Sequence, residues 1–127
     1  MKINLLTEKI IGCCIEVHKC LGPGLLESTY EECSSYEMTK SGLFVERQKE
    51  LSVIYKGVKL DCGYRIDLLV ETQVILEFKS VEKILPIHEA QIITYLKLSG
   101  NSVGLLINFN SIILTKGIKR FVNNYKE

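Results

Sequence analysis

The stretch from Tyr64 to Lys79, YRIDLLVETQVILEFK, constrains the fold more than any other part of the chain. Two runs rich in Val, Ile, Leu and Phe flank a polar break at residues 71–73, and this pattern predicts a β-hairpin. Because side chains alternate along a strand, one face of the hairpin carries only apolar residues. That face is predicted to consist of Ile66, Leu68, Val70, Val74, Leu76 and Phe78.

Charged side chains gather on the other face, at the end away from the turn. With the turn centred on its middle residue, Asp67 falls opposite Glu77, and Arg65 falls opposite Lys79. The hairpin is too apolar for a solvated ribbon, so two carboxylates beside an ammonium indicate a site for a hard divalent cation such as Mg²⁺. The alternative is a cross-strand ion-pair cluster of Asp67, Glu77 and Lys79, worth about 1 kcal/mol or less if exposed.

Composition predicts one globular domain spanning residues 1–127. No apolar run approaches the roughly 18–20 residues that a membrane-spanning helix needs, so we expect no membrane partner. The net charge of +1 neither favours nor excludes nucleic acid. Three basic clusters are either phosphate contacts or solvated faces: Arg47/Lys49, Lys56/Lys59/Arg65 and Lys116/Lys119/Arg120.

The cysteines predict a reducing, cytoplasmic location. Their count of five is odd and no CxxC pair occurs, which argues against a disulfide framework or a structural zinc site. Cys13, Cys14 and Cys33 fall in helical patterns and are expected to be small buried hydrophobes.

Taken in order, the chain predicts an α/β protein with one mixed sheet and helices packed around it. The expected elements are a helix over 4–20, capped by Asn4 or Thr7; a helix over 25–40; a strand over 44–55; a turn at 56–57; a short return over 58–61 with a break or bulge at 62–63; the hairpin; a helix over 87–99; strands over 103–109 and 112–115; and a helix over 116–125. His18, near the end of the first helix, is expected to make a packing or dipole contact.

Two helices carry further candidate residues. Glu27 and Tyr30 are three apart and share one helix face, although Glu27 is also a favourable acid for a first turn. Gln91 and Tyr95 lie one turn apart on the helix after the hairpin, with His88 one turn earlier. A buried tyrosine and a surface glutamine are the alternatives for the later pair.

Asp67, nine residues, then Glu77-x-Lys79 resembles the active-site core of the PD-(D/E)XK nuclease superfamily. The segment from Gly24 to Tyr30 matches the GxxExxY signature of a family of small proteins within it. The resemblance covers nearly the whole chain, including LTEKIIG (6–12), EVHKCLGPGLLESTYEE (16–32), ERQKELSVIYKG (46–57), YRIDLLVE (64–71), VILEFKSVEKILPIHEAQIITYLKLSG (74–100), GLLINFN (104–110) and GIKRFVN (117–123).

The resemblance implies a restriction-endonuclease-like core and a role for each candidate residue. Asp67, Glu77 and Glu27 would hold Mg²⁺ or Mn²⁺, with the Phe78 carbonyl beside them, and Lys79 would orient the attacking water and stabilise negative charge. Residues expected to contact substrate or support the site are Tyr30, Arg65, Gln91 and Tyr95, and those expected to meet phosphate are Arg65, Lys49 and the basic residues of 116–120.

The sequence therefore predicts a metal-dependent nuclease acting on DNA. Two alternatives stay open, an RNA substrate and a non-catalytic adaptor or nucleic-acid-binding domain that keeps the fold. The oligomeric state is also open, a homodimer included.

Overall fold

The structure, a computed structural model, describes residues 1–124. The last residue of the predicted C-terminal helix, Tyr125, lies outside the described residues. The elements in chain order are α1 (Ile3–Leu21), α2 (Glu27–Lys40), β1 (Val45–Tyr55), β2 (Val58–Val70), β3 (Val74–Lys79), α3 (Pro86–Ser99), β4 (Val103–Asn108), the 3₁₀ helix η1 (Leu114–Gly117) and β5 (Ile118–Val122).

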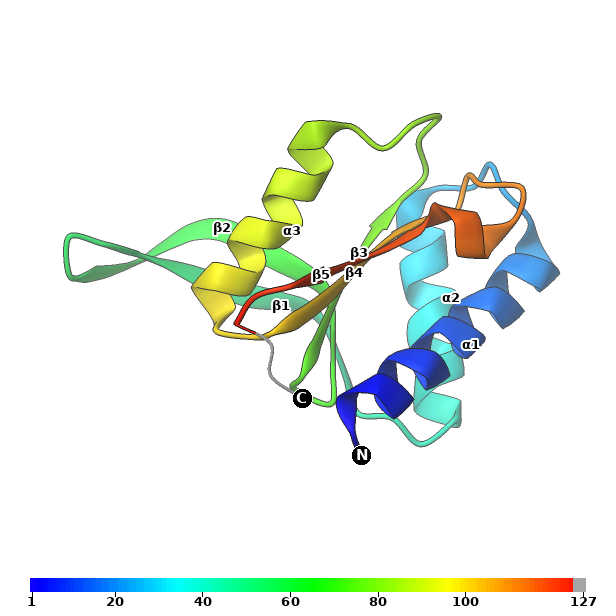
Figure 1. Ribbon diagram of the computed structural model, residues 1–127, viewed down its shortest axis with the longest axis horizontal. Coiled ribbons are helices and arrows are strands. Elements are labelled where there is room, and N and C mark those ends of the chain that lie inside the picture. Colours follow the sequence, from blue (N-terminus) through cyan, green and yellow to red (C-terminus); the bar gives the residue numbers. More distant parts are fainter. Residues whose placement is uncertain (125–127) are drawn as a thin grey trace.

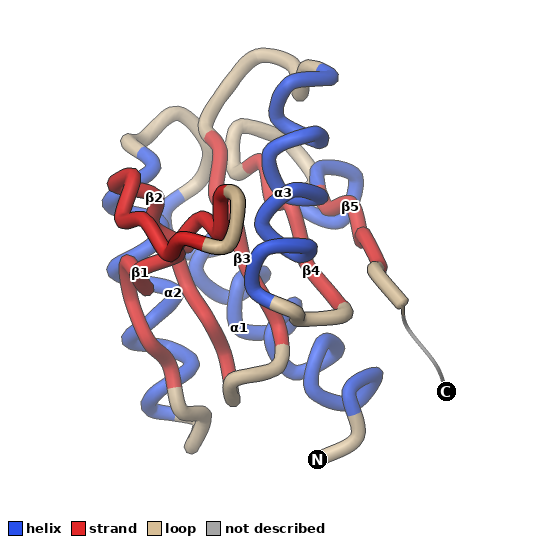
Figure 2. Tube along the Cα trace, turned by 90° about the vertical axis from the view of Figure 1, so that its left-hand side faces the viewer, coloured by secondary structure: helices blue, strands red, loops and turns tan. Residues whose placement is uncertain are grey.

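These elements form the predicted mixed sheet with helices on both faces. The strand order is β1-β2-β3-β4-β5, in which β3 and β4 are parallel and all other neighbours are antiparallel. The parallel pair needs a crossover connection, and α3 supplies it. Helices α1 and α2 cover one face and α3 covers the other (Figures 1 and 2).

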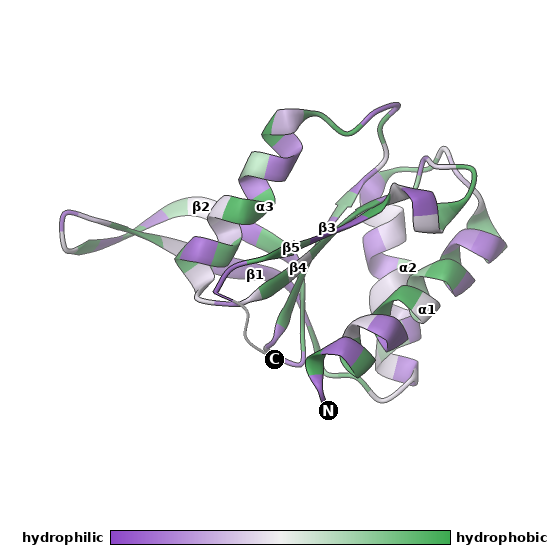
Figure 3. Ribbon diagram, viewed as in Figure 1, coloured by the Kyte–Doolittle hydropathy of each residue, from purple (hydrophilic) through white to green (hydrophobic). Residues whose placement is uncertain are grey.

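Two hydrophobic cores hold the layers together, one on each face of the sheet. The larger core joins α1 and α2 to the sheet through residues such as Leu6, Tyr30 and Phe109. The smaller core joins α3 to the sheet through Ile92 and Leu96. All residues of β4 are buried, as expected for a strand covered on both faces, and Figure 3 shows hydrophobic residues along β3 and β4 in the middle of the molecule.

The central hairpin forms with the predicted register. Leu68 pairs with Leu76 and Val70 pairs with Val74. At the turn the Gln73 N–H donates to the Val70 carbonyl over 3.0 Å. The two residues between them, Glu71 and Thr72, have φ values of 53° and 55°. Positive φ at both central positions is the geometry of a type I′ hairpin turn.

The β1–β2 hairpin extends beyond the rest of the molecule as an arm, here defined as residues 51–64 (Figure 1). The predicted turn at Lys56-Gly57 is confirmed. The predicted interruption at Cys62-Gly63 is an irregularity rather than a strand end, because β2 continues from Val58 to Val70. The pairing register shifts at this level, and Gly63 takes a φ of 81°, which glycine adopts without steric cost.

The C-terminal elements differ from the prediction. No strand forms over 112–115, and η1 and β5 replace the expected helix from residue 116. Lys119 and Arg120 therefore lie on an edge strand that pairs with β4. Ile118 packs against the larger core and Phe121 against the smaller core, so each face of the sheet gains one anchor from this strand.

Several local predictions at α1 have clear outcomes. Neither Asn4 nor Thr7 caps this helix, because it begins at Ile3 and the Thr7 hydroxyl donates to the Asn4 carbonyl instead. The ring of His18 makes a packing contact of the expected kind with Phe109, with centroids 6.2 Å apart, and its Nε2 also forms a 2.8 Å hydrogen bond with the Ser111 carbonyl. No helix within residues 1–124 combines the length and the apolar character needed to cross a membrane.

All five cysteines are free. Cys13 and Cys14 are buried and Cys33 is half-buried in the helices where they were predicted. The other two, Cys20 and Cys62, are exposed.

Candidate active site

Strands β2 and β3 separate at the end away from their turn, and two carboxylates fill the opening. The paired residues run only as far as Leu68 and Leu76. Beyond them, the Asp67 N–H donates to Glu77 Oε2 over 2.8 Å, and the Phe78 N–H donates to Asp67 Oδ2 over 2.9 Å. The predicted juxtaposition of Asp67 and Glu77 is therefore present, and each carboxylate takes the place of a backbone acceptor on the neighbouring strand.

The alternation of side chains along β2 breaks at the same level, so the predicted sheet face of Ile66 is wrong. Leu68 packs in the core beneath α1 and α2, as predicted, whereas Ile66 packs with Leu69 beneath α3. On β1, Gln48 lies between the residues that pair on either side of Asp67, and its φ of 49° is left-handed. Strands β1 and β2 are thus both distorted here. Beyond this point, strict alternation assigns side chains to the wrong face of the sheet.

Arg65 is not opposite Lys79, contrary to the prediction. The pairing of β2 with β3 ends at Leu68 and Leu76, so Arg65 has no partner on β3, and on the other side of β2 it pairs with Glu50 of β1. Its guanidinium donates to Asp61 over 3.4 Å and to the Tyr64 carbonyl over 2.8 Å. Arg65 therefore lies at the base of the arm, and its guanidinium is hydrogen-bonded there.

Burial makes ionisation of the paired acids unfavourable. Glu77 is 3% exposed, and its pKa is raised to about 8, first by burial and then by the nearby negative charge of Asp67. The pKa of Asp67 is raised as well, chiefly by burial, while its hydrogen bond from Phe78 and the charge of Lys79 act in the opposite direction. Two acids in one buried opening favour either a bound proton or a cation beside them.

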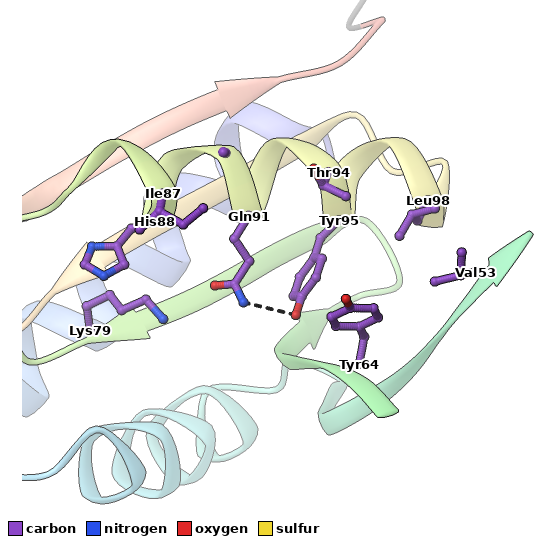
Figure 4. Close-up of a pocket in the computed structure, with 10 residues that line it drawn as sticks. Val53, Tyr64, Lys79, Ile87, His88, Gln91, Thr94, Tyr95 and Leu98 are labelled. Atoms are coloured by element: carbon purple, nitrogen blue, oxygen red, sulfur yellow. Dashed lines mark hydrogen bonds between the residues drawn. The ribbon is translucent and has the colours of Figure 1, made fainter. Parts of the chain in front are cut away.

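Lys79 lies at the end of β3 and faces α3 rather than forming a tight ion pair. Among the ion pairs of residues 1–124 with N–O distances up to 4.0 Å, none joins Lys79 to Asp67 or Glu77. The alternative of a cross-strand ion-pair cluster therefore lacks its defining contacts. Figure 4 shows the Lys79 side chain pointing along a groove toward Gln91.

The α3 candidates gather along this groove. Gln91 Nε2 donates to the Tyr95 hydroxyl over 3.2 Å (Figure 4). The pKa of Tyr95 is raised, first by burial and then by the charge of Glu77. His88 has a local partner, because its Nδ1 accepts the Leu85 N–H over 2.9 Å at the start of α3. Gln91 and Tyr95 thus lie beside the acids, while His88 stabilises the helix end.

Glu27 reaches the same end of β3 from the first turn of α2. Its Oε2 accepts the Ser80 N–H over 3.3 Å, and the Ser80 hydroxyl donates to the Leu25 carbonyl over 2.6 Å. Its charge contributes to the raised pKa of Asp67. Glu27 therefore belongs to the same electrostatic environment, held in place by the residue that follows Lys79.

Tyr30 is a buried positioning residue. Its ring stacks on Phe109 with centroids 4.3 Å apart and is completely inaccessible to solvent. Its hydroxyl donates to the Gly22 carbonyl over 2.5 Å and accepts the Leu25 N–H over 3.1 Å. Tyr30 thus fixes the loop that precedes Glu27, and its hydroxyl points into that loop rather than toward the acids.

Glu31 and Gln48 join the candidate site although the sequence analysis did not single them out. Together with Glu27, Ser28 and Asp67 they line a cavity of about 450 Å³, here called the acid pocket. Glu31 accepts Arg47 Nη2 over 3.1 Å and Gln48 Nε2 over 2.5 Å. Glu31 could have been found from its position one helical turn after Glu27.

The donor chemistry fits a hard divalent cation held by few protein ligands. Within residues 1–124, no group of three or more His, Cys, Asp or Glu side chains has the geometry to hold a metal ion. Asp67 and Glu77 nevertheless offer carboxylate oxygens beside the acid pocket, with Glu27 nearby. Mg²⁺ commonly takes one or two carboxylates and completes its shell with water and phosphate, which this arrangement fits.

The predicted phosphate-binding residues outside the opening mostly have side-chain partners. Lys49 contacts Glu46 over 2.9 Å and Lys119 contacts Glu89 over 2.9 Å. Arg120 donates to Asn4 over 2.9 Å. These exposed pairs are weak, so they leave the basic side chains able to exchange partners.

Comparison with known proteins gave a match to one protein family. The sequence model of a protein family described as the PD-(D/E)XK nuclease superfamily matches residues 4–121. Searches of curated proteins and of solved structures gave no significant match.

Proposed function

Because this chain belongs to the PD-(D/E)XK nuclease superfamily, whose fold is restriction-endonuclease-like, we propose that it is a metal-dependent nuclease that hydrolyses phosphodiester bonds in DNA. One structural observation gives the proposal its main support. Asp67 and Glu77 meet in an opening of the sheet, through hydrogen bonds of 2.8 and 2.9 Å to each other's strands, and Lys79 follows directly on the same strand.

The proposed ligands of the metal are Asp67 and Glu77, with Glu27 completing the site. Bound Mg²⁺ or Mn²⁺ would supply charge neutralisation at the scissile phosphate and lower the pKa of the attacking water. The raised pKa of Glu77, about 8, supports this assignment because a cation would relieve the repulsion that burial intensifies.

The remaining residues would orient the reactants. Lys79 is proposed to hold the attacking water and to stabilise the negative charge that develops on the phosphate. Gln91 and Tyr95, which hydrogen-bond to each other beside Lys79, would contact the substrate. Tyr30 would act indirectly, by fixing the loop before Glu27.

The narrower family assignment rests on Gly24, Glu27 and Tyr30, which match the GxxExxY signature. Two of these residues make hydrogen bonds that support the proposal: Glu27 accepts one from Ser80, and Tyr30 donates one to the loop before α2. We assign the chain to this group of small proteins as part of the proposal. The cytoplasmic location and the single domain stay predictions.

The test is DNA cleavage by purified wild type and Lys79→Met in the presence of Mn²⁺. Methionine keeps most of the length of the lysine stem and removes its charge, so the strand should still form. We expect the cleavage rate to fall by about 10²-fold or more, the contribution typical of a group that acts on a proton or charge in the transition state. Lys83→Met, at an exposed lysine four residues later, is the matched control and should cleave like wild type.

Equal cleavage by wild type and Lys79→Met would assign the activity to a contaminant or another site. Cleavage of RNA but not of DNA would replace the proposed substrate. If wild type cleaves neither with any divalent metal while melting normally, the non-catalytic binding domain becomes the better account.

A further inference from the structure

A groove lies between the base of the arm and α3, on the side of the sheet opposite the acid pocket. Its volume is about 670 Å³, within the range of pockets that bind small molecules. We call it the α3 groove; the residues that matter for its character are Val53, Tyr64, Lys79, Gln91, Tyr95 and Leu98 (Figure 4). One wall comes from β1 and β2 and the other from α3.

The groove combines an apolar end with a polar end. At the apolar end, Tyr64 is 45% exposed and approaches Tyr95 edge-on, with ring centroids 6.0 Å apart. Tyr95 is buried, so the Tyr64 ring rests against a residue that belongs to the smaller core. At the polar end, Lys79 and Gln91 offer an ammonium and an amide. Such a pocket suits a flat, partly polar ring attached to an anionic group.

The polar end borders the acids of the candidate active site. Lys79 lines the groove and lies two residues after Glu77 on the same strand. The charges of Glu77 and Asp67 both reach Tyr95, where they add to the effect of burial in raising the pKa of its hydroxyl. An anion placed between the acids and Lys79 would therefore lie at the polar end of the groove, with Gln91 and then Tyr95 and Tyr64 following along the groove (Figure 4).

We propose that the α3 groove binds the base of an unpaired nucleotide next to the scissile phosphate, with the base against the Tyr64 ring and its polar edge toward Gln91. This inference rests on the proposed nuclease function and names its substrate class, single-stranded or locally unpaired DNA. A base inside a duplex is covered on both faces by its neighbours and on one edge by its partner, so it cannot enter a pocket without leaving the stack. Aromatic stacking serves single-strand binding because every base has an exposed face once unpaired.

The experiment measures equilibrium binding by fluorescence anisotropy in EDTA, so that no cleavage occurs. The probes are a labelled DNA single strand, the same strand in a full duplex, and that duplex with one unpaired nucleotide. We expect wild type to bind the single strand and the interrupted duplex at least 10-fold more tightly than the full duplex. Tyr64→Ala should weaken single-strand binding roughly 5- to 100-fold, the usual effect of removing one stacking ring, and Tyr64→Phe should retain it.

Two further variants separate the groove from the rest of the arm. Tyr55→Ala removes an exposed tyrosine at the tip of the same arm, outside the groove, and should bind like wild type. Ala90→Leu fills the groove from an exposed position of α3 with a good helix former, so it should weaken single-strand binding without disturbing the core.

Equal affinity for single strand and duplex would overturn the proposal, as would unchanged binding by Tyr64→Ala or an equal loss in Tyr55→Ala. The two proposals can fail separately. Tyr64-dependent binding without any cleavage would contradict the nuclease and leave the groove standing. Cleavage of duplex and single strand at equal rates, with Tyr64→Ala unaffected in binding and cleavage, would contradict the groove alone.

Discussion

Glu77 is a carboxylic acid buried where two strands separate, and without a cation its ionisation opposes folding. Its pKa is about 8 in the folded chain and near 4.5 when unfolded. Between these values the folded state binds more protons than the unfolded state, so the free energy of unfolding falls as pH rises. The loss begins above pH 4.5 and is complete above pH 8.

Glu77→Gln should remove this loss in metal-free protein. The glutamine carbonyl can still accept the Asp67 N–H, and the variant has no charge to bury. We expect the two proteins to be equally stable near pH 4.5 and the variant to be more stable above pH 8, by more than about 1.4 kcal/mol, the free energy of one pKa unit. Chemical denaturation in EDTA from pH 4.5 to 9 measures the difference. Glu82→Gln, at an exposed acid, should show no such divergence.

The residues of the site were predictable to different degrees. Asp67, Glu77 and Lys79 followed from strand alternation and hairpin register, which are local. Arg65 and Ile66 were misplaced because strict alternation cannot show where a strand twists away from its neighbour. Glu31 and Gln48 were missed because their partners come from other elements, such as Arg47 and Asp67.

Among the elements, those with a strong local pattern were predicted well. The first helix was expected over 4–20 and spans Ile3–Leu21, and the buried strand expected over 103–109 spans Val103–Asn108. The edge strand Ile118–Val122 was predicted as part of a helix, because the consecutive charged residues Lys119 and Arg120 interrupt the alternating pattern typical of a strand. Its pairing with β4 is a long-range interaction that a local pattern does not reveal. Charged residues are common on edge strands because they discourage pairing with other chains.

The turn between β2 and β3 carries a conformational cost that a single substitution should relieve. Thr72 is β-branched and has a φ of 55°, a region that costs residues other than glycine about 1–2 kcal/mol. Thr72→Gly should stabilise the chain by about 1 kcal/mol in chemical denaturation. The bond from Asn101 to the backbone carbonyl of residue 72 remains available.

The control for this turn is Thr39→Gly, at an exposed position within α2. There the backbone is helical and glycine is disfavoured, so the same substitution should destabilise. A loss of stability in both variants would show that the Thr72 side chain contributes more than its backbone conformation costs.

At the scale of the whole molecule, the sheet opening has a cavity on each side, because Asp67 lines the acid pocket and Lys79 lines the α3 groove. The acid pocket is lined from α2, β1 and β2, and the α3 groove from α3, β1, β2 and β3. In the proposed function, the separation of β2 from β3 would let Asp67 and Glu27 from one cavity and Lys79 from the other act on one phosphate.

Binding of a cation at the opening should therefore be visible in the stability of the entire chain. Mg²⁺ or Mn²⁺ that binds only the folded state raises the free energy of unfolding by about 2.7 kcal/mol at a concentration 100 times its Kd. Because the cation competes with the proton held by Glu77, the increase should be larger at pH 8.5 than at pH 6. Thermal melts with and without metal measure it. Asp67→Asn should reduce the gain, whereas Asp61→Asn, at an exposed aspartate on the arm, should retain it. Equal gains in Asp67→Asn and wild type would place the bound cation elsewhere.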